Sequence, residues 1–472
     1  MDDPKIDLAV VCRGLDKLQV VDVHLQLGID HPQLVFEAMN STGKKLSQAD
    51  LIRNFVLMDL PASEQAKLWK RYWRPMELDF ARAGREGVFD EFVRHYLTVV
   101  TGRIPRVDDI YDTFKDHAAA RLKHGESIDS IVVELREYSK RYTAIALGGE
   151  RLPDLLAAFD ELAQIRADVV YPFLLEVYTD YELGVIAADD FLKIVRLVIS
   201  YIVRRAVTGY ATNSLNTTFQ TFGRAIRKDR YVESIKAQFL RLQGYRAFPT
   251  DSEFEEKLKT FDAYHFKRRA YFFRSLENFG RKEPVPTEQY TIEHILPQNE
   301  DLRPAWRADL GPDWAEVQAR YLHTLGNLTL TGYNSEFSDR SCAEKREMTG
   351  GFRESPLRLN QGIGTLAVWN ESTIRARAAR LAAEALTVWT RPELPAETIG
   401  TYQEPRADTE RAIEDHPNLL RPERREQFER LSEEVLAFDP AVVREFLKIR
   451  VPSRQIRPSW TSSHGHRDFF SC

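Results

Sequence analysis

Hydrophobic residues recur at intervals of three and four along the middle of the chain, which predicts helices. Residues 152–165 ("LPDLLAAFDELAQI") show this spacing clearly. Residues 189–205 ("DDFLKIVRLVISYIVRR") begin with two carboxylates and end in Arg204-Arg205, which matches the helix dipole, and are apolar enough for the central helix of a bundle. The region from about 63 to 280 is therefore predicted to be mostly helical.

The N-terminal region has a different pattern. Residues 17–27 alternate valines and leucine with polar residues, which predicts a strand, and Asn40–Gly43 predicts a turn. Ser47 is a good helix N-cap, with Asp50 at the third position of a capping box and Leu46 placed to pack on Leu51. One strand and one helix are interpreted as the end of a larger domain.

Proline-containing charged segments divide the rest of the chain. One linker is predicted at 281–289 and a flexible one at 390–410, after an alanine- and arginine-rich helix over 372–389. One or two further helices are predicted at 424–449, followed by a disordered tail. The predicted domains are 1–62, 63–283, 284–395 and 396–472, the last comprising linker, helices and tail.

Composition excludes several classes of protein. The 472 residues are 43% hydrophobic and 29% charged, without a run of the roughly 20 apolar residues that a membrane span needs. The acidic N-terminus lacks the pattern of a signal peptide, so a cytoplasmic location is expected. The three cysteines (Cys12, Cys342 and Cys472) are scattered, which argues against disulfides or a thiolate zinc site. A net charge of −5 leaves DNA binding open, because phosphate contacts depend on local basic patches.

The stretch "YTIEHILPQN" (290–299) begins as a strand and stops at Glu293-His294 before Pro297. A second string, 323–346, contains the short strand pattern "NLTLT", with Asn327 at its start and Asn334 just past its end. Folded as a hairpin and capped by the following helix, these elements would bring together an imidazole, a carboxylate and a carboxamide.

Those groups suit hydrolysis of a phosphodiester. A neutral imidazole near its unperturbed pKa can take a proton from water, which makes His294 the predicted general base and predicts that cleavage fades as pH drops through the ordinary histidine range. Glu293 and Asn334 are the predicted ligands of a divalent ion, Mg²⁺ or Mn²⁺, and Asn327 would tie down the loop so that His294 is correctly aimed.

At this point the sequence resembles a known family. "IEHILPQ", then "LGNLTLTGYN" and a downstream lysine, Lys345, resemble the HNH nuclease domain of GmrSD-type restriction endonucleases, bacterial defence proteins that cut modified phage DNA. The resemblance covers roughly 287–392 and implies a small α+β domain of the ββα-metal (His-Me finger) type in a multi-domain, mainly α chain. It places the base at His294, the acidic position at Glu293, the central asparagine at Asn327, the final ligand at Asn334 and a phosphate contact at Lys345.

The segment "FEAMNSTGKKLSQADLIRNFVL" (36–57) similarly resembles the distal end of the family's ParB-like N-terminal domain. The Asp-Gly-Gln-Gln-Arg-type string that the family associates with nucleotide hydrolysis is absent, so the chain is expected to begin partway through that domain and nucleotide dependence has no support. "NSTGKK" lacks the spacing of a phosphate-binding loop. The implied partner is DNA, including modified phage DNA, with no membrane; assembly into a homo-oligomer is left open.

Simpler interpretations remain. The chain could be a non-catalytic DNA- or partner-binding relative, or hold a structural zinc module. Glu293 could be a solvent-facing strand residue that pairs with an arginine, and Asn334 could be a left-handed turn residue. Lys345 could be a solvated charge on a helix. His323 is expected to be structural. The basic clusters at 204–205 and 266–274 are expected to be solvated faces over an aromatic core, with DNA-backbone binding as the alternative.

Overall fold

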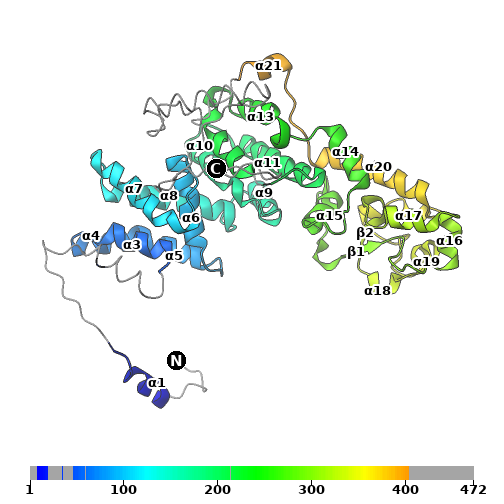
Figure 1. Cartoon of the computed structure of the whole chain (residues 1–472), viewed down its shortest axis with the longest axis horizontal. Helices are drawn as coiled ribbons and strands as arrows, with labels where there is room; N and C mark the ends of the chain where they lie inside the picture. Colours follow the sequence, from blue (N-terminus) through cyan, green and yellow to red (C-terminus); the bar gives the residue numbers. More distant parts are fainter. Residues whose placement is uncertain (1–7, 20–34, 36–45, 59, 213, 403–472) are drawn as a thin grey trace, which may run out of the picture. The chain divides into compact units, whose positions relative to one another are not determined.

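The computed structural model describes residues 8–19, 35, 46–58, 60–212 and 214–402 (Figure 1). These residues are mainly helical, with one small two-stranded sheet, as predicted. The strand predicted at 17–27 lies almost wholly outside the described residues, and so do the turn at 40–43, the helices at 424–449 and the tail. None of the described helices is both long enough and apolar enough to cross a membrane.

The first described helices form a bundle with a continuous aromatic and aliphatic core. Ser47 caps α3 by accepting a hydrogen bond from Asp50 N, as predicted, and its hydroxyl donates to the Asp50 carboxylate. A π-helical stretch, Trp69–Trp73, joins α4 to α5. The helices of this bundle are α3 (Gln48–Leu57), α4 (Ala62–Leu68), α5 (Arg74–Ala81), α6 (Val88–Thr101), α7 (Ile110–Lys123) and α8 (Ile128–Ala146). Helix α1 (Leu8–Leu15) contributes no residue to their core.

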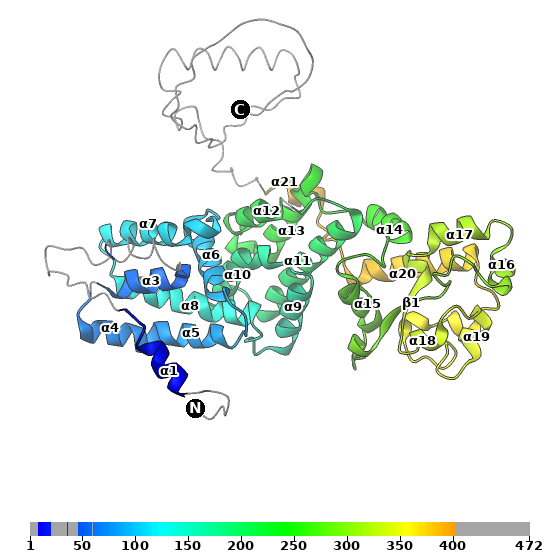
Figure 2. The same cartoon turned by 60° about the horizontal axis from the view of Figure 1, so that its bottom comes forward.

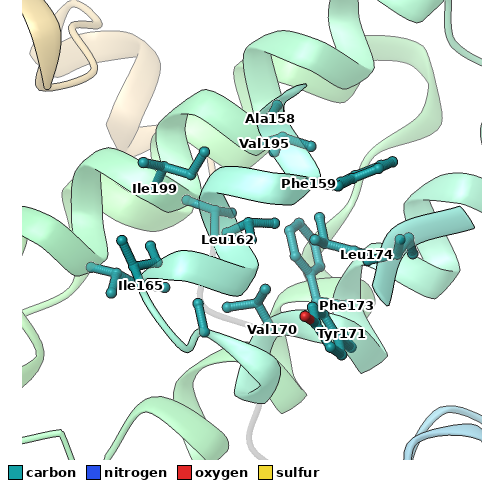
Figure 3. Packing of buried hydrophobic residues seen from close by; sticks show 14 of the residues in the cluster. Ala158, Phe159, Leu162, Ile165, Val170, Tyr171, Phe173, Leu174, Val195 and Ile199 are labelled. Atoms are coloured by element: carbon teal, nitrogen blue, oxygen red, sulfur yellow. The ribbon is translucent and has the colours of Figure 1, made fainter. Parts of the chain in front are cut away.

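The bundle continues through α9 (Pro153–Gln164), α10 (Tyr171–Glu182), α11 (Ala188–Thr208), α12 (Leu215–Phe222), α13 (Tyr231–Arg241), α14 (Asp251–Thr260) and α15 (Arg269–Asn278). The long helix α11 packs against α9, α10, α13 and α14, which confirms the predicted central helix. Figure 3 shows the apolar side of α9, including Phe159 and Leu162, meeting Val195 and Ile199 of α11. The apolar residues whose spacing predicted α9 and α11 therefore form the buried faces of these two helices.

The basic pair at the end of α11 is buried, contrary to both interpretations of the sequence. Arg204 Nε donates to the carbonyl of Trp389 at 2.6 Å, and its guanidinium lies 2.6 Å from the Asp251 carboxylate. Arg205 Nη1 donates to Tyr245 O at 2.6 Å. These cations bind backbone oxygens inside the protein, so they are neither a solvated face nor a surface for DNA. In the second cluster Tyr271–Phe273 are buried while Lys267 and Arg269 are exposed, as expected for a solvated face.

The predicted strands form β1 (Thr291–His294) and β2 (Leu328–Thr331), which are antiparallel with Thr291 opposite Thr331 and His294 opposite Leu328. They are not joined by a tight turn: α16 (Pro304–Leu310), α17 (Trp314–Tyr321) and the 3₁₀ turn η8 (Leu325–Asn327) lie between them. After β2 come α18 (Asn334–Phe337), α19 (Cys342–Glu347), α20 (Glu371–Val388) and α21 (Ala396–Gly400), which can be followed in Figures 1 and 2. Helix α20 packs against both α14 and η8.

Two hydrophobic cores meet at the sheet. Leu328 and Leu330 of β2 belong to the large core of the bundle, whereas Ile295 and Leu296, just after β1, belong to a smaller one. The smaller core includes Trp306, Phe337, Trp369 and Ile374. Residues 390–402, expected within a flexible linker, contain α21 and the buried Tyr402, whose hydroxyl donates to Glu233.

Candidate functional site

His294 is the last residue of β1, so it lies at the end of the sheet. Its side chain is only 4% exposed. Its Nε2 lies 3.0 Å from His323 Nδ1, and its Nδ1 lies 2.9 Å from the amide nitrogen of Gln298. The Tyr264 ring covers the imidazole, with 4.5 Å between ring centroids. Burial, then the nearby His323 and Lys345, lowers the pKa of His294 to about 3, so the ring is neutral at physiological pH.

Glu293 faces away from His294, because neighbouring residues of a strand point to opposite sides of the sheet. Its carboxylate accepts a hydrogen bond from Lys345 Nζ at 2.6 Å, and both side chains are buried. Lys345 Nζ also donates to the carbonyls of His294 and Ile295, each at 3.1 Å. The three protons of the ammonium group thus have three partners within the protein.

Burial acts against both charges of this ion pair. It raises the pKa of Glu293 and lowers the pKa of Lys345, while each partner's charge opposes the effect on the other. Glu293 is therefore not a solvent-facing residue paired with arginine, and Lys345 is not a solvated helix charge. Lys345 has no donor directed toward solvent, and its predicted phosphate contact has no support in this arrangement.

Asn327 joins the segments that follow β1 and precede β2. Its Oδ1 accepts from Leu296 N at 2.8 Å and from Trp369 Nε1 at 3.2 Å. Its Nδ2 donates to Leu296 O and to Leu322 O, both at 3.0 Å. With its side chain fully buried and both amide atoms engaged, Asn327 fixes the backbone just beyond His294.

Arg377 of α20 supports the same turn, and the sequence analysis did not single it out. Its guanidinium donates to the carbonyls of Leu325, Gly326, Leu328 and Leu359 at 2.8–3.0 Å. Burial lowers its pKa to about 9. Gly326 is needed here because a Cβ would lie 2.4 Å from Ile374 O of the same helix. The only sign of this role in the sequence was that Arg377 lies on the apolar side of an alanine-rich helix.

Asn334 opens α18 beside β1. Its Nδ2 donates to Thr291 Oγ1 at 3.1 Å and to Ile292 O at 3.0 Å, which turns its Oδ1 away from the strand. It is not among the described residues with positive φ, so the left-handed turn interpretation is wrong. Asn334 lines a cavity of about 460 Å³ together with Tyr264, Ile292 and Leu330. Because Tyr264 also covers His294, the cavity lies on the His294 side of the sheet.

The predicted metal ligands were tested against this geometry. The Glu293 carboxylate is bound by Lys345, whereas the Asn334 amide is bound to Thr291 and Ile292 at the start of β1 and lines the cavity. Within the described ranges, no group of three or more His, Cys, Asp or Glu side chains is placed to hold a metal ion. Glu293 and Asn334 therefore do not fit a shared ion in this arrangement, and their ligand roles stay predictions.

Residues around the start of α15 complete the site, and the sequence analysis did not single out Tyr264 or His265 among them. The Tyr264 ring stacks on His323 with 5.3 Å between centroids, and His265 contacts His323 edge-on at 4.8 Å. Ala263 N donates to His323 O at 2.9 Å, beside a bridge between Asp262 and Thr324. The guanidinium of Arg269 lies 5.1 Å from the Tyr264 ring centroid. Tyr264 lies among charged residues in a loop, so no periodic pattern in the sequence singled it out.

The part of the chain that holds all these residues is similar to a domain of restriction endonucleases. Residues 248–384 match the family model described as GmrSD restriction endonucleases, C-terminal domain. The match begins just before α14 and ends within α20, so it includes Tyr264, His323 and Arg377 as well as the two strands. No curated protein matches the chain.

Proposed function

We propose that this protein is a DNA endonuclease of the HNH (ββα-metal) type that hydrolyses phosphodiester bonds in the restriction of modified or phage DNA. The observation that carries the proposal is the position of His294, a buried imidazole that ends a strand within the segment that matches a restriction endonuclease domain. The ParB-like character of residues 36–57 belongs to the same proposal.

In the proposed step, His294 is the general base. A water molecule loses a proton to Nδ1 of His294, its oxygen forms a bond to phosphorus, and the bond from phosphorus to the leaving oxygen breaks. Nδ1 is the nitrogen available for this, since Gln298 donates its amide proton there and Nε2 faces His323. Water would replace Gln298 as the partner of Nδ1.

The other residues hold this arrangement. Asn327 and Arg377 fix the turn next to His294, and Lys345 binds the carbonyl of His294 itself. Lys345 is therefore proposed as a positioning residue. Asn334, with its amide oriented by β1, is proposed to contact the substrate from the cavity wall.

Dependence on Mg²⁺ or Mn²⁺ stays a prediction. A divalent ion would stabilise charge on the scissile phosphate and the leaving oxygen. Glu293 would be free to bind it only if Lys345 released its carboxylate, so no step is assigned to the ion. Titrating metal into EDTA-treated protein tests the dependence directly.

Cleavage of plasmid DNA tests the function. Purified protein supplied with Mg²⁺ or Mn²⁺ should nick or cut plasmid, and His294→Ala should lower the rate by about 100-fold or more. His124→Ala, an exposed histidine near the end of α7, is the matched control and should cleave normally. Equal cleavage by wild type and His294→Ala would refute the assignment of the base.

The alternative function is that of a non-catalytic DNA- or partner-binding relative. It predicts DNA binding with no cleavage by either protein under any metal. Comparing glucosylated, methylated and plain DNA, with and without nucleoside triphosphate, tests the modified substrate and nucleotide dependence. Sedimentation of the purified chain tests the homo-oligomer.

A further inference from the structure

His323 was expected to be a structural histidine, but its contacts give it a more specific task. It lies in the segment before β2, and its ring meets His294, which ends β1, through a single hydrogen bond of 3.0 Å. The ring is held from behind by the stack with Tyr264, and its backbone carbonyl accepts from Ala263. A residue fixed in this way presents its Nδ1 to His294 in one orientation.

The hydrogen bonds around His294 select one tautomer. The atom of Gln298 that meets Nδ1 is an amide nitrogen, which can only donate, so Nδ1 must accept. A neutral imidazole carries one proton, which is then on Nε2 and is donated to His323 Nδ1. His323 must accept and therefore keeps its own proton on Nε2. Burial also lowers the pKa of His323, which favours this neutral form.

The hydrogen bonds at Nδ1 and at Nε2 of His294 differ in what happens when substrate binds. Water can displace the donor at Nδ1, because Gln298 belongs to the irregular segment after β1. His323 is held more firmly, because its ring packs against Tyr264 and His265 and its backbone carbonyl accepts from Ala263. When Nδ1 takes a proton, the bond from Nε2 to His323 becomes charge-assisted and hence stronger.

We infer that His323 is the positioning residue for His294: it accepts the Nε2 proton, fixes the ring orientation and leaves Nδ1 as the nitrogen that receives the proton from water. This rests on the proposed function of His294 as a base. A base oriented by a third group is a general feature of activated nucleophiles. Here a neutral imidazole takes the orienting place that a carboxylate fills in many such sites.

Two substitutions separate this role from simple packing. His323→Phe keeps a ring to stack on Tyr264 but has no acceptor. His323→Asn is smaller but places an oxygen close to where Nδ1 lies, so it restores an acceptor. We expect His323→Phe to lower kcat by about 100-fold with little change in KM, and His323→Asn to regain most of that loss. A purely structural role predicts the opposite order, because phenylalanine fills the space better.

A spectroscopic measurement decides the point without relying on activity. Long-range ¹H–¹⁵N spectra of the full chain labelled at histidine report the tautomer of each ring, and the His294 signal is assigned by its loss in His294→Ala. Because Gln298 also donates to Nδ1, the spectra are compared in the Gln298→Ala background. There, Gln298→Ala and Gln298→Ala/His323→Asn should show His294 protonated at Nε2, and Gln298→Ala/His323→Phe should lose this preference.

An unchanged tautomer in Gln298→Ala/His323→Phe, or equal kcat in His323→Phe and wild type, would overturn the inference. If His294→Ala itself cleaves like wild type, the proposed base is wrong, and the tautomer spectra alone then decide whether His323 orients His294.

Discussion

Removing the ammonium group of Lys345 gives the sharpest test of how the end of β1 is held. Lys345→Met keeps the length of the side chain but leaves the Glu293 carboxylate buried at 3% exposure without its partner at 2.6 Å. Breaking a buried ion pair in this way typically costs about 3–5 kcal/mol. Because each 1.4 kcal/mol is a factor of about ten, local opening of β1 should become roughly 100- to 4000-fold more frequent.

Amide hydrogen exchange of peptides covering β1 and β2 measures this opening and does not require the whole chain to unfold in one step. The double variant Glu293→Gln/Lys345→Met removes both charges. It should lose only the two bonds to backbone carbonyls, about 2 kcal/mol in total, and so exchange more slowly than Lys345→Met. The control is Lys193→Met, which removes an exposed lysine from an ion pair with Asp190 and should leave β1 unchanged.

Equal exchange in Lys345→Met and the double variant would refute the reasoning, since Glu293 would then not depend on Lys345. The same double variant bears on the metal prediction. If Glu293 is only the partner of Lys345, the double variant should retain a metal requirement equal to that of wild type. A shifted metal requirement would return Glu293 to the role of ligand.

Three further predictions follow from the same contacts. Because the pKa of His294 is lowered to about 3, its base form persists down to about pH 4, so single-turnover cleavage should not fall between pH 7.5 and 5.5 on its account, contrary to the sequence-based expectation of a fall near pH 6.5. Gly326→Ala should destabilise the turn by about 2 kcal/mol or more, measured by exchange at Asn327, because the added Cβ meets Ile374 O. Burial raises the pKa of Glu176 to about 7, so the folded state binds the extra proton and stability falls as pH rises from about 4.5 to 7. Glu176→Gln should therefore raise the melting temperature at pH 8 and change it little at pH 4; an equal effect at both would contradict the assignment.

Local sequence patterns predicted the elements that carry the site. The spacing of apolar residues predicted α9 and α11, and "YTIEH" and "NLTLT" predicted β1 and β2 within a residue or two, because helix and strand periodicity are properties of neighbouring residues. The N-cap at Ser47 was predictable for the same reason.

Contacts between distant segments were not predictable. Glu293 and Lys345 meet because α19 packs beside β1. His323 meets Tyr264 because the loop before α15 pairs with the segment that precedes η8. Neither pairing produces a periodic pattern in the sequence. The burial of Arg204 was not expected because the sequence placed it in the last turn of a helix ending at residue 205, where it fits the helix dipole. The helix continues to Thr208, and Arg204 is buried against Trp389, far along the chain.

Helix α20 is bound by other parts of the protein at two points. Near its middle Arg377 clamps the turn beside His294, and just past its end the carbonyl of Trp389 is held by Arg204 of α11. These anchors are separated by roughly 18 Å of helix, at 1.5 Å per residue. A helix of that length is stiff, so a displacement of α11 would be transmitted through α20 to the turn beside His294.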